Sequence, residues 1–381
     1  MSVGTARTVW ILGAGFSRSL GGPLLSDLFK PRAWGDDAIF FPHDRFPNLA
    51  DDLFMTRVLF ASGQKEGLWS NAEEFLAYAD AAHRAEGSLR RAILASLAKR
   101  TKTDGLGETG PSAGQGRSAM RERVLTNLHR VARRALAAQT AEFLLDLDKQ
   151  DERWRPYRDW VSTLQPMHDT VISLNYDLVL EELGGNHLEV MLPQQPQTWP
   201  TNKAPVLKLH GSIDWLENGK TVERVPRESL LVSEEAEPLI AAPGRSKTAV
   251  VKDSLEPLWK VARRALGAAG AIMLVGYSFP QTDAGARIDL LNSIANGDAG
   301  YRTRRIDIVM GPDTTKPEVR RVHALAEACT NGRKLTTAQP MVATSGPSSG
   351  DRFLWVTSQP LWAEDFIADY MMRLREFSCD R

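Results

Sequence analysis

The chain has 381 residues, which is enough for one large domain or two smaller ones. Lysine and arginine total 47, as do aspartate and glutamate, and this balance excludes an overall basic field as the means of binding nucleic acid or an anionic membrane. The two cysteines are too few for a disulfide framework or a four-cysteine zinc site. We therefore expect a reduced, cytoplasmic protein without zinc and, because no apolar run reaches about 18 residues, without a membrane partner.

Five short apolar runs predict buried strands, because none shows the alternation of a half-exposed strand. They are residues 8–12, 171–175, 206–210, 271–277 and 306–310. Such runs are typical of parallel strands with helices on both faces. Helical spacing of apolar residues at 255–266 and 282–295 alternates with the later runs. The pattern predicts an α/β fold with a Rossmann-like, doubly wound, mostly parallel sheet.

The long stretch between the first two predicted strands has a different composition. Residues 71–100 and 120–149 are rich in Ala, Leu, Arg and Glu. One helix face carries Val124, Leu128, Val131 and Ala135. We expect an inserted helical subdomain at 61–164, within a Rossmann-like domain made of 1–60 and 165–381.

Three further segments complete the predicted layout. Residues 23–29 (PLLSDLF) predict a helix with Pro23 in its first turn. The Gly- and Ser-rich segments 101–118 and 336–351 predict loops. The basic run 128–134 is a local patch that can contact nucleic acid or an acidic partner, but a solvated helix face is favoured.

The first strand ends in a glycine turn, Gly13-Ala14-Gly15-Phe16-Ser17. A strand that turns sharply into a helix presents free backbone N–H groups, and glycine lets a pyrophosphate approach the backbone. The full GxGxxG pattern is absent, because Arg18 stands in place of the third glycine. The alternative is a tight turn that needs glycine only for its dihedral angles.

The second strand leads into Asn175-Tyr176-Asp177, at the end of a sheet where ligands bind in open α/β folds. The Asn175 amide suits a ribose hydroxyl or a water, and the Asp177 carboxylate suits an amide or a sugar hydroxyl. The alternative for Asp177 is an N-cap of the helix that follows.

The third and fourth strands also end in polar groups. His210, before Gly211, suits proton transfer in an exposed cleft, because an unperturbed imidazole titrates at about pH 6.5. The alternative is a core or surface histidine. The turn 276–278 offers donors to a phosphate or a ribose. Its alternative is a connection to a helix capped by Thr282 or Asp283.

In this order the four motifs resemble the sirtuin-like (SIR2-like) NAD-consuming domains of bacterial antiphage defence. The resemblance spans residues 13–280 and includes the helical insertion. It implies catalytic roles for Asn175, Asp177 and His210. It implies nucleotide contacts at Gly13, Ala14, Gly15, Phe16, Ser17, Tyr176, Gly276, Tyr277 and Ser278. The sirtuin deacylases carry a four-cysteine zinc module after the histidine, and its absence here favours cleavage of NAD+ itself.

The implied activity is that of an NAD+ glycohydrolase, with NAD+ as substrate and nicotinamide and ADP-ribose as products. Asn175 would orient the ribose or the water, His210 would be the general base, and Asp177 would steer the carboxamide or the sugar. The resemblance also implies a homo-oligomer or a separate sensor subunit, such as a HerA-like ATPase. Because the net charge is zero, we expect any sensing of nucleic acid to belong to such a partner or to a local patch. Two alternatives stay open: an NAD-dependent protein deacylase or ADP-ribosyltransferase, and a non-catalytic subunit that senses NAD or ADP-ribose.

Overall fold

The computed structural model describes residues 7–30, 50–100, 122–145, 148, 150–195, 200–226, 237–242, 250–280, 283–296, 305–329 and 355–379. The chain forms two compact units. The first comprises Met1–Gly22, Asp146–His210 and Ser254–Arg381, and the second comprises Pro23–Leu145 and Gly211–Asp253. The predicted loops at 101–118 and 336–351, and Thr282, lie outside the described residues.

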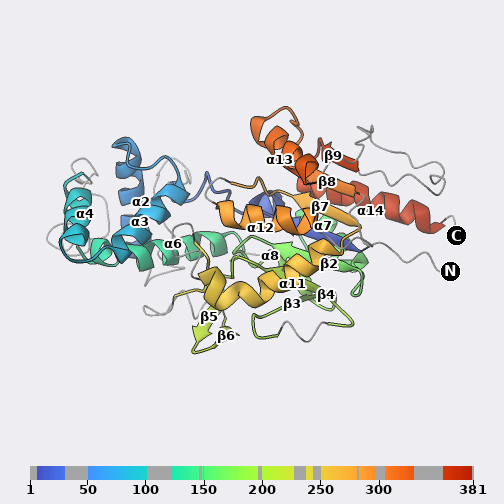
Figure 1. The fold of residues 1–381 in the computed structure, drawn as a ribbon, viewed down its shortest axis with the longest axis horizontal. Coiled ribbons are helices and arrows are strands. Elements are labelled where there is room, and N and C mark those ends of the chain that lie inside the picture. The colour runs from blue at the N-terminus through green and yellow to red at the C-terminus, as the bar shows by residue number, and fades with distance from the viewer. Residues whose placement is uncertain are drawn as a thin grey trace. The chain divides into compact units, whose positions relative to one another are not determined.

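Within the described residues, the first unit is built on seven parallel strands in the order β3-β4-β2-β1-β7-β8-β9 (Figure 1). The strands are β1 Thr8–Leu12, β2 Asp169–Ser173, β3 Leu188–Val190, β4 Ala204–Lys208, β7 Ala271–Val275, β8 Arg305–Val309 and β9 Trp355–Gln359. The central strands are almost fully buried, since helices cover both faces. The predicted α/β fold with a doubly wound parallel sheet is confirmed.

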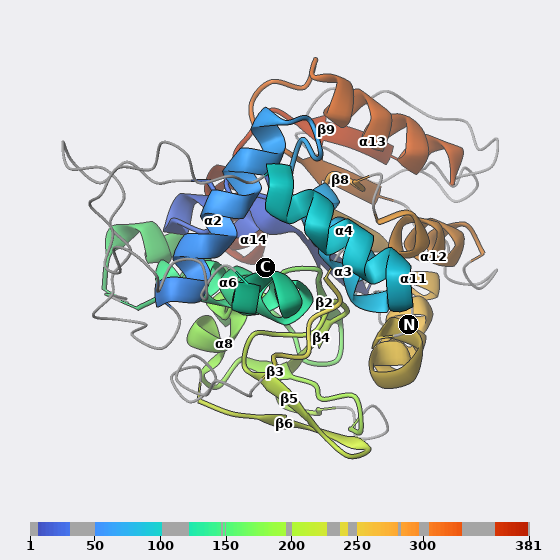
Figure 2. The ribbon, with the colours of Figure 1, turned by 90° about the vertical axis from the view of Figure 1, so that its left-hand side faces the viewer.

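Helices of the first unit form two layers. They are α1 Ala14–Ser17, α7 Arg155–Thr163, α8 Val179–Gly184, α11 Glu256–Gly267, α12 Ala284–Ala295, α13 Pro317–Ala328 and α14 Ala363–Cys379. Helix α11 packs on α12, whereas α7 packs on α8 and α14. Figure 2 shows α8 on one side of strands β2, β3 and β4 and α11 and α12 on the other.

Segment 150–164 belongs to the first unit, although the predicted insertion includes it. Its aromatic residues explain this difference. The rings of Trp160 and Trp10 meet edge to face at 5.2 Å, and those of Tyr157 and Phe16 at 5.0 Å. The Tyr157 hydroxyl also donates to the Phe16 carbonyl at 2.8 Å. This cluster joins α7 to the first strand and its turn, so α7 belongs to the first unit. The second unit comprises Pro23–Leu145 and Gly211–Asp253 instead of the predicted 61–164.

The second unit is mainly helical. It contains α2 Ala50–Lys65, α3 Ala72–Arg84, α4 Gly87–Arg100 and α6 Leu128–Glu142, and a hairpin of β5 Trp215–Asn218 and β6 Thr221–Arg224. Helices α2 and α3 pack on α6. The predicted apolar face is confirmed, because Val124, Leu128, Val131 and Ala135 are all buried. No helix in the described part of the chain is long and apolar enough to cross a bilayer.

Segment 24–30 is a succession of turns, so the predicted helix at 23–29 is wrong. The Asp27 amide donates to the Leu24 carbonyl at 2.9 Å, as in a turn, and the Phe29 amide donates to Gln139 Oε1 at 2.9 Å instead of to a carbonyl one helical turn earlier. Phe29 then adopts a φ of 60°, which no helix interior contains.

The basic run on α6 was expected to be a solvated helix face. This expectation is wrong for Arg133 and Arg134, which are buried. Arg133 donates to the carbonyls of Pro238 and Ile240 at 3.2 and 2.8 Å and pairs with Glu237 at 3.0 Å. Arg134 lies 3.6 Å from the Asp52 carboxylate. These two cations hold the second unit together and leave only the rest of the run for other contacts.

Candidate functional site

Four neighbouring strands bring the four motifs to one edge of the sheet, the edge that the carboxyl ends of the strands form. Leu12 at the end of β1 is aligned with Ser173 of β2 and Val275 of β7, and Ser173 is aligned with Lys208 of β4. The chain leaves all four strands at the same level. The direction in which strands are added reverses between β1 and β7, which is the switch point where open α/β sheets bind ligands.

The glycine turn after β1 packs directly on the turn after β7. The Gly13 amide donates to the Val275 carbonyl at 2.9 Å, and the Gly15 amide donates to the Gly276 carbonyl at 3.1 Å. A Cβ on Gly13 would lie 2.5 Å from the Gly276 carbonyl oxygen, and one on Gly15 would lie 2.7 Å from the Gly276 Cα. Close approach of the two backbones therefore requires glycine at these positions.

This packing, and not the dihedral angles, accounts for the first glycine of the turn, and it engages part of the turn's backbone. Gly13 has a φ of −117°, so its dihedral angles do not require glycine, whereas Gly276 has a φ of +69°. The Phe16 amide donates to the Gly13 carbonyl at 2.9 Å. The amides of Gly13, Gly15 and Phe16 thus have acceptors within the protein and are not free for a phosphate. Ala14, Gly15, Gly276 and Ser278 are partly exposed and form the accessible surface of the paired turns.

Asn175 links the second motif to the first. Its Nδ2 donates to the Gly13 carbonyl at 2.9 Å and to Ser17 Oγ at 3.2 Å. Its backbone amide donates to Ser173 Oγ at 3.2 Å. These bonds fix the orientation of the Asn175 amide group, and the side chain is only 8% exposed.

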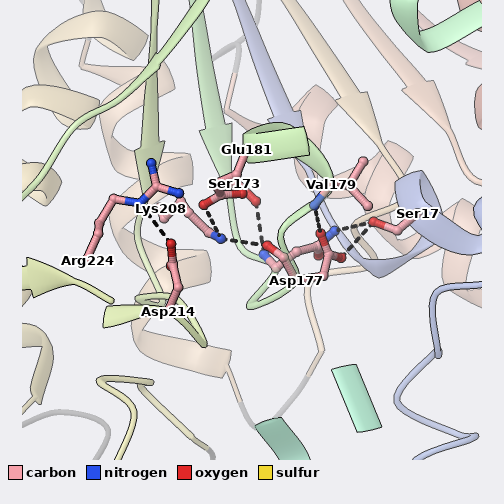
Figure 3. A network of polar contacts seen from close by, with 9 residues as sticks. Ser17, Ser173, Asp177, Val179, Glu181, Lys208, Asp214 and Arg224 are labelled. Atoms are coloured by element: carbon pink, nitrogen blue, oxygen red, sulfur yellow. Dashed lines mark hydrogen bonds and ion pairs between the residues drawn. The ribbon is translucent and has the colours of Figure 1, made fainter. Parts of the chain in front are cut away.

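Asp177 is held by donors on both carboxylate oxygens (Figure 3). Ser17 Oγ donates to Oδ2 at 2.7 Å, and the Val179 amide donates to Oδ1 at 3.1 Å. Burial raises the pKa of Asp177, and the Lys208 cation and these hydrogen bonds oppose that rise. Val179 is the first residue of α8, so the Asp177 carboxylate caps the helix from the residue before the N-cap position, Leu178. The alternative expected for Asp177 was a cap at the N-cap position itself.

Lys208 is a residue of this edge that sequence reasoning did not single out. It is fully buried, and its Nζ donates to the Asp177 carbonyl at 2.6 Å and to Glu181 Oε1 at 2.8 Å (Figure 3). A lysine inside an otherwise apolar strand was the available signal, because a buried ammonium requires partners. The pair ties β4 to α8 and to the loop that carries Asn175 and Asp177.

His210 is buried, whereas an exposed position in a cleft was expected. Its Nδ1 lies 3.1 Å from the Leu174 carbonyl, and its Nε2 lies 3.3 Å from Asp283 Oδ2. The Tyr277 hydroxyl donates to the same Asp283 oxygen at 2.5 Å. The Tyr176 ring lies beside the imidazole, with 6.1 Å between centroids.

Asp283 enters this site although the sequence suggested only a helix cap for it. Asp283 does occupy the N-cap position of α12, but its side chain makes no capping bond to that helix. Its carboxylate lies against His210 and Tyr277 instead.

No group of three or more potential metal-ligating side chains occurs among the residues that the structure describes. No model of a known protein family matches the chain, and no curated protein is significantly similar to it in sequence.

Proposed function

We propose that this chain is an NAD+ glycohydrolase, which hydrolyses NAD+ to nicotinamide and ADP-ribose. The observation that carries the proposal is that Asn175 and His210 lie at the same edge of the sheet. Asn175 is held there by hydrogen bonds to Gly13 and Ser17, and His210 by its contact with the Leu174 carbonyl. That edge is where open α/β sheets bind nucleotides. The resemblance to sirtuin-like defence domains supports NAD+ as the substrate and antiphage defence by NAD+ depletion as the setting.

The reaction needs no strong acid catalysis at the leaving group. Nicotinamide leaves a pyridinium as a neutral base, so the protein has to stabilise the positive charge that develops on the ribose and to deliver water. One water is consumed and one proton is released. With Nδ2 of Asn175 held by Gly13 and Ser17, we assign Oδ1 to a ribose hydroxyl or to the water. Proton acceptance at His210 would contribute roughly 100- to 10,000-fold to the rate.

Asp177 has a different role in this proposal from the one the resemblance implies. Both of its carboxylate oxygens already accept hydrogen bonds, from Ser17 and Val179. We therefore assign it to positioning: it holds Ser17, which in turn contacts the Asn175 amide.

The second candidate is a subunit that binds NAD or ADP-ribose without turnover. The observation that favours it is the engagement of Asn175, Asp177 and His210 with protein partners, all at 8% exposure or less. A binding site needs the same edge of the sheet but no accessible base. Binding of NAD+ with no product under any condition would select this candidate.

The test is incubation of the purified protein with NAD+ and separation of the products by chromatography. We expect nicotinamide and ADP-ribose from the native chain and at least a 100-fold loss in Asn175→Ala and in His210→Ala. Asn186→Ala and His187→Ala are matched controls, since both side chains are exposed before β3. Full activity in both site variants would overturn the assignment. Addition of an acetyl-lysine peptide separates hydrolysis from deacylation, because only a deacylase would consume it.

A partner is part of the proposal, because unregulated NAD+ hydrolysis would kill the cell. The resemblance supports a homo-oligomer or a complex with a sensor such as a HerA-like ATPase. Native mass spectrometry of the complex isolated from its cell gives the subunit stoichiometry directly. A monomer with constitutive activity would contradict this part.

A further inference from the structure

Arg321 connects helix α13 to the turn after β7. The residue lies in the second turn of α13, which begins at Pro317, after the carboxyl end of β8. Its Nη2 donates a hydrogen bond to the Ser278 carbonyl at 2.9 Å. A hydrogen bond from a guanidinium is charge-assisted and is stronger than one between neutral groups. Arg321 therefore holds the backbone of the fourth motif from a different element.

This bond is the one hydrogen bond that the guanidinium makes within the part of the chain that the structure describes. Arg321 Nε is buried there and has no hydrogen-bond partner among the described residues. Burial of part of a cation is unfavourable unless its donors are used. An arginine with one backbone acceptor is thus a poor choice for stability alone, and the placing of the Ser278 carbonyl accounts for it better.

The backbone beside this bond is strained. Phe279 has a φ of 50°, which a bulky residue rarely adopts and which persists only where neighbouring contacts impose it. The Phe279 ring is fully buried and packs edge to face on Tyr277, with 4.9 Å between centroids. The peptide group before Phe279 contains the Ser278 carbonyl, so the bond from Arg321 fixes the orientation of that group. Packing holds the ring, and Arg321 holds the peptide group.

The turn from Gly276 to Phe279 places several groups of the site at once. The Gly276 carbonyl accepts from the Gly15 amide at 3.1 Å, and the Tyr277 hydroxyl donates to Asp283 at 2.5 Å. Gly276 and Ser278 are partly exposed at the edge of the sheet. Relaxation of the strained backbone would displace these groups together.

We infer that Arg321 is a positioning residue for nucleotide binding: it holds the strained turn so that Gly276 and Ser278 keep the placement in which they contact the substrate. This role in binding rests on the proposed function, whereas the hold on the turn does not. A phosphate keeps its charge throughout the reaction, so contacts to it bind substrate and transition state equally. Loss of the hold should therefore weaken binding more than it slows the chemical step.

Hydrogen exchange of the full chain, followed by mass spectrometry, tests the hold on the turn without any substrate. We expect the peptide containing Gly276 to Phe279 to exchange at least about tenfold faster in Arg321→Ala than in the native protein, because its backbone opens more often. Arg320→Ala, the exposed neighbour on α13, is the matched control and should exchange as the native chain does. Arg321→Lys keeps the charge and a donor, should lie between the two, and decides the question if Arg321→Ala does not fold. Native exchange rates in both Arg321 variants would overturn the inference.

Calorimetric titration with ADP-ribose and kinetics with NAD+ test the role in binding. Arg321→Ala should raise the Kd for ADP-ribose and the KM for NAD+ about tenfold and change kcat less than about threefold. Methylguanidinium, at concentrations too low to unfold the protein, should restore part of the affinity of Arg321→Ala and leave Arg320→Ala unchanged. Native affinity in a variant with faster exchange would refute the role in binding. If the native chain binds neither ADP-ribose nor NAD+, the proposed function fails, while hydrogen exchange still decides whether Arg321 holds the turn.

Discussion

Gly276 brings the backbone of one turn against the backbone of another, and no side chain fits between them. A Cβ at this position would lie 2.4 Å from the Phe16 nitrogen, and its φ of +69° is unfavourable for other residues. Both neighbours are backbone, which cannot move aside as a flexible side chain can. The contact thus fixes the distance between β1 and β7 at the edge where the site lies.

Replacement of this glycine has a clear expected cost. Gly276→Ala should lower the free energy of unfolding by about 2 kcal/mol or more, through strain and overlap together. Gly285→Ala in α12 is the matched control, because its Cβ would meet no atom within 4 Å and alanine favours a helix. Urea denaturation of both variants measures the difference. Equal stability of the two would contradict the packing described here.

Asp169, at the start of β2, predicts a pH dependence of stability. Burial raises its pKa from 3.8 to about 6. The folded state therefore binds the proton more tightly than the unfolded state, and this contribution to stability is lost as the pH rises from about 4 to about 6. Asp169→Asn should stabilise the protein by about 1 to 3 kcal/mol at pH 7.5 and by much less at pH 4.

Thermal denaturation of Asp169→Asn and the native chain at both pH values gives the measurement. The variant keeps a side-chain oxygen that can accept the Gln165 amide, which now donates to Asp169 at 2.7 Å. A gain that is the same at pH 4 and pH 7.5 would show that the charge is not its cause.

At the scale of elements, a buried ion pair joins β4 to α8. Lys208 contacts Glu181 at 2.8 Å and the Asp177 carbonyl at 2.6 Å. Helix α8 has only 6 residues, too few to be stable without tertiary contacts. The ion pair therefore anchors the loop from Asn175 to Asp177 to the end of β4, two residues before His210.

Removal of one partner of this pair should be costly. Lys208→Met should lower the free energy of unfolding by about 3 to 5 kcal/mol, because it leaves the Glu181 carboxylate buried without this cation. The double variant Lys208→Met with Glu181→Leu should recover a large part of that loss. Lys220→Met, on the exposed turn of the β5–β6 hairpin, should have almost no effect. Chemical denaturation measures all three, and additive losses in the double variant would argue against a coupled pair.

The sequence predicted the central strands better than the two outermost strands. Strands β1, β2, β4, β7 and β8 are buried on both faces and show as apolar runs. β3 and β9 lie at the two edges of the sheet, where burial is partial, and they have no such pattern. The helix expected at 23–29 is absent because a tertiary contact replaces a helical one: the Phe29 amide donates to Gln139 Oε1, and Phe29 takes a φ of 60°.

For the candidate site, the sequence predicted which turns meet but not how each side chain is used. Parallel strand ends necessarily share an edge, so the convergence of Gly13, Asn175, His210 and Gly276 followed from the fold alone. The pairing of His210 with Asp283 depends on where the chain goes after β7, which no local pattern encodes. The same is true of Lys208, whose partners lie on another element.

At the scale of the whole molecule, the balance of 47 basic and 47 acidic residues gives a net charge of zero at pH 7. A protein without net charge has no long-range repulsion between copies. We expect the solubility at low ionic strength to be lowest near pH 7 and to rise at pH 5.5 and pH 9. Turbidity across that range, at low and at moderate salt, is the measurement. A minimum far from neutrality would indicate that bound ions or a partner alter the charge.

The central position of β1 has a consequence for synthesis on the ribosome. This strand is made before its neighbours β2 and β7, which begin only at Asp169 and Ala271. Until those segments emerge, β1 has no partner on either side and the paired glycine turns do not exist. Asp283 follows later still. A nascent chain that ends before Asp283 holds no complete site, so the protein acquires whatever activity it has only after this residue has been translated.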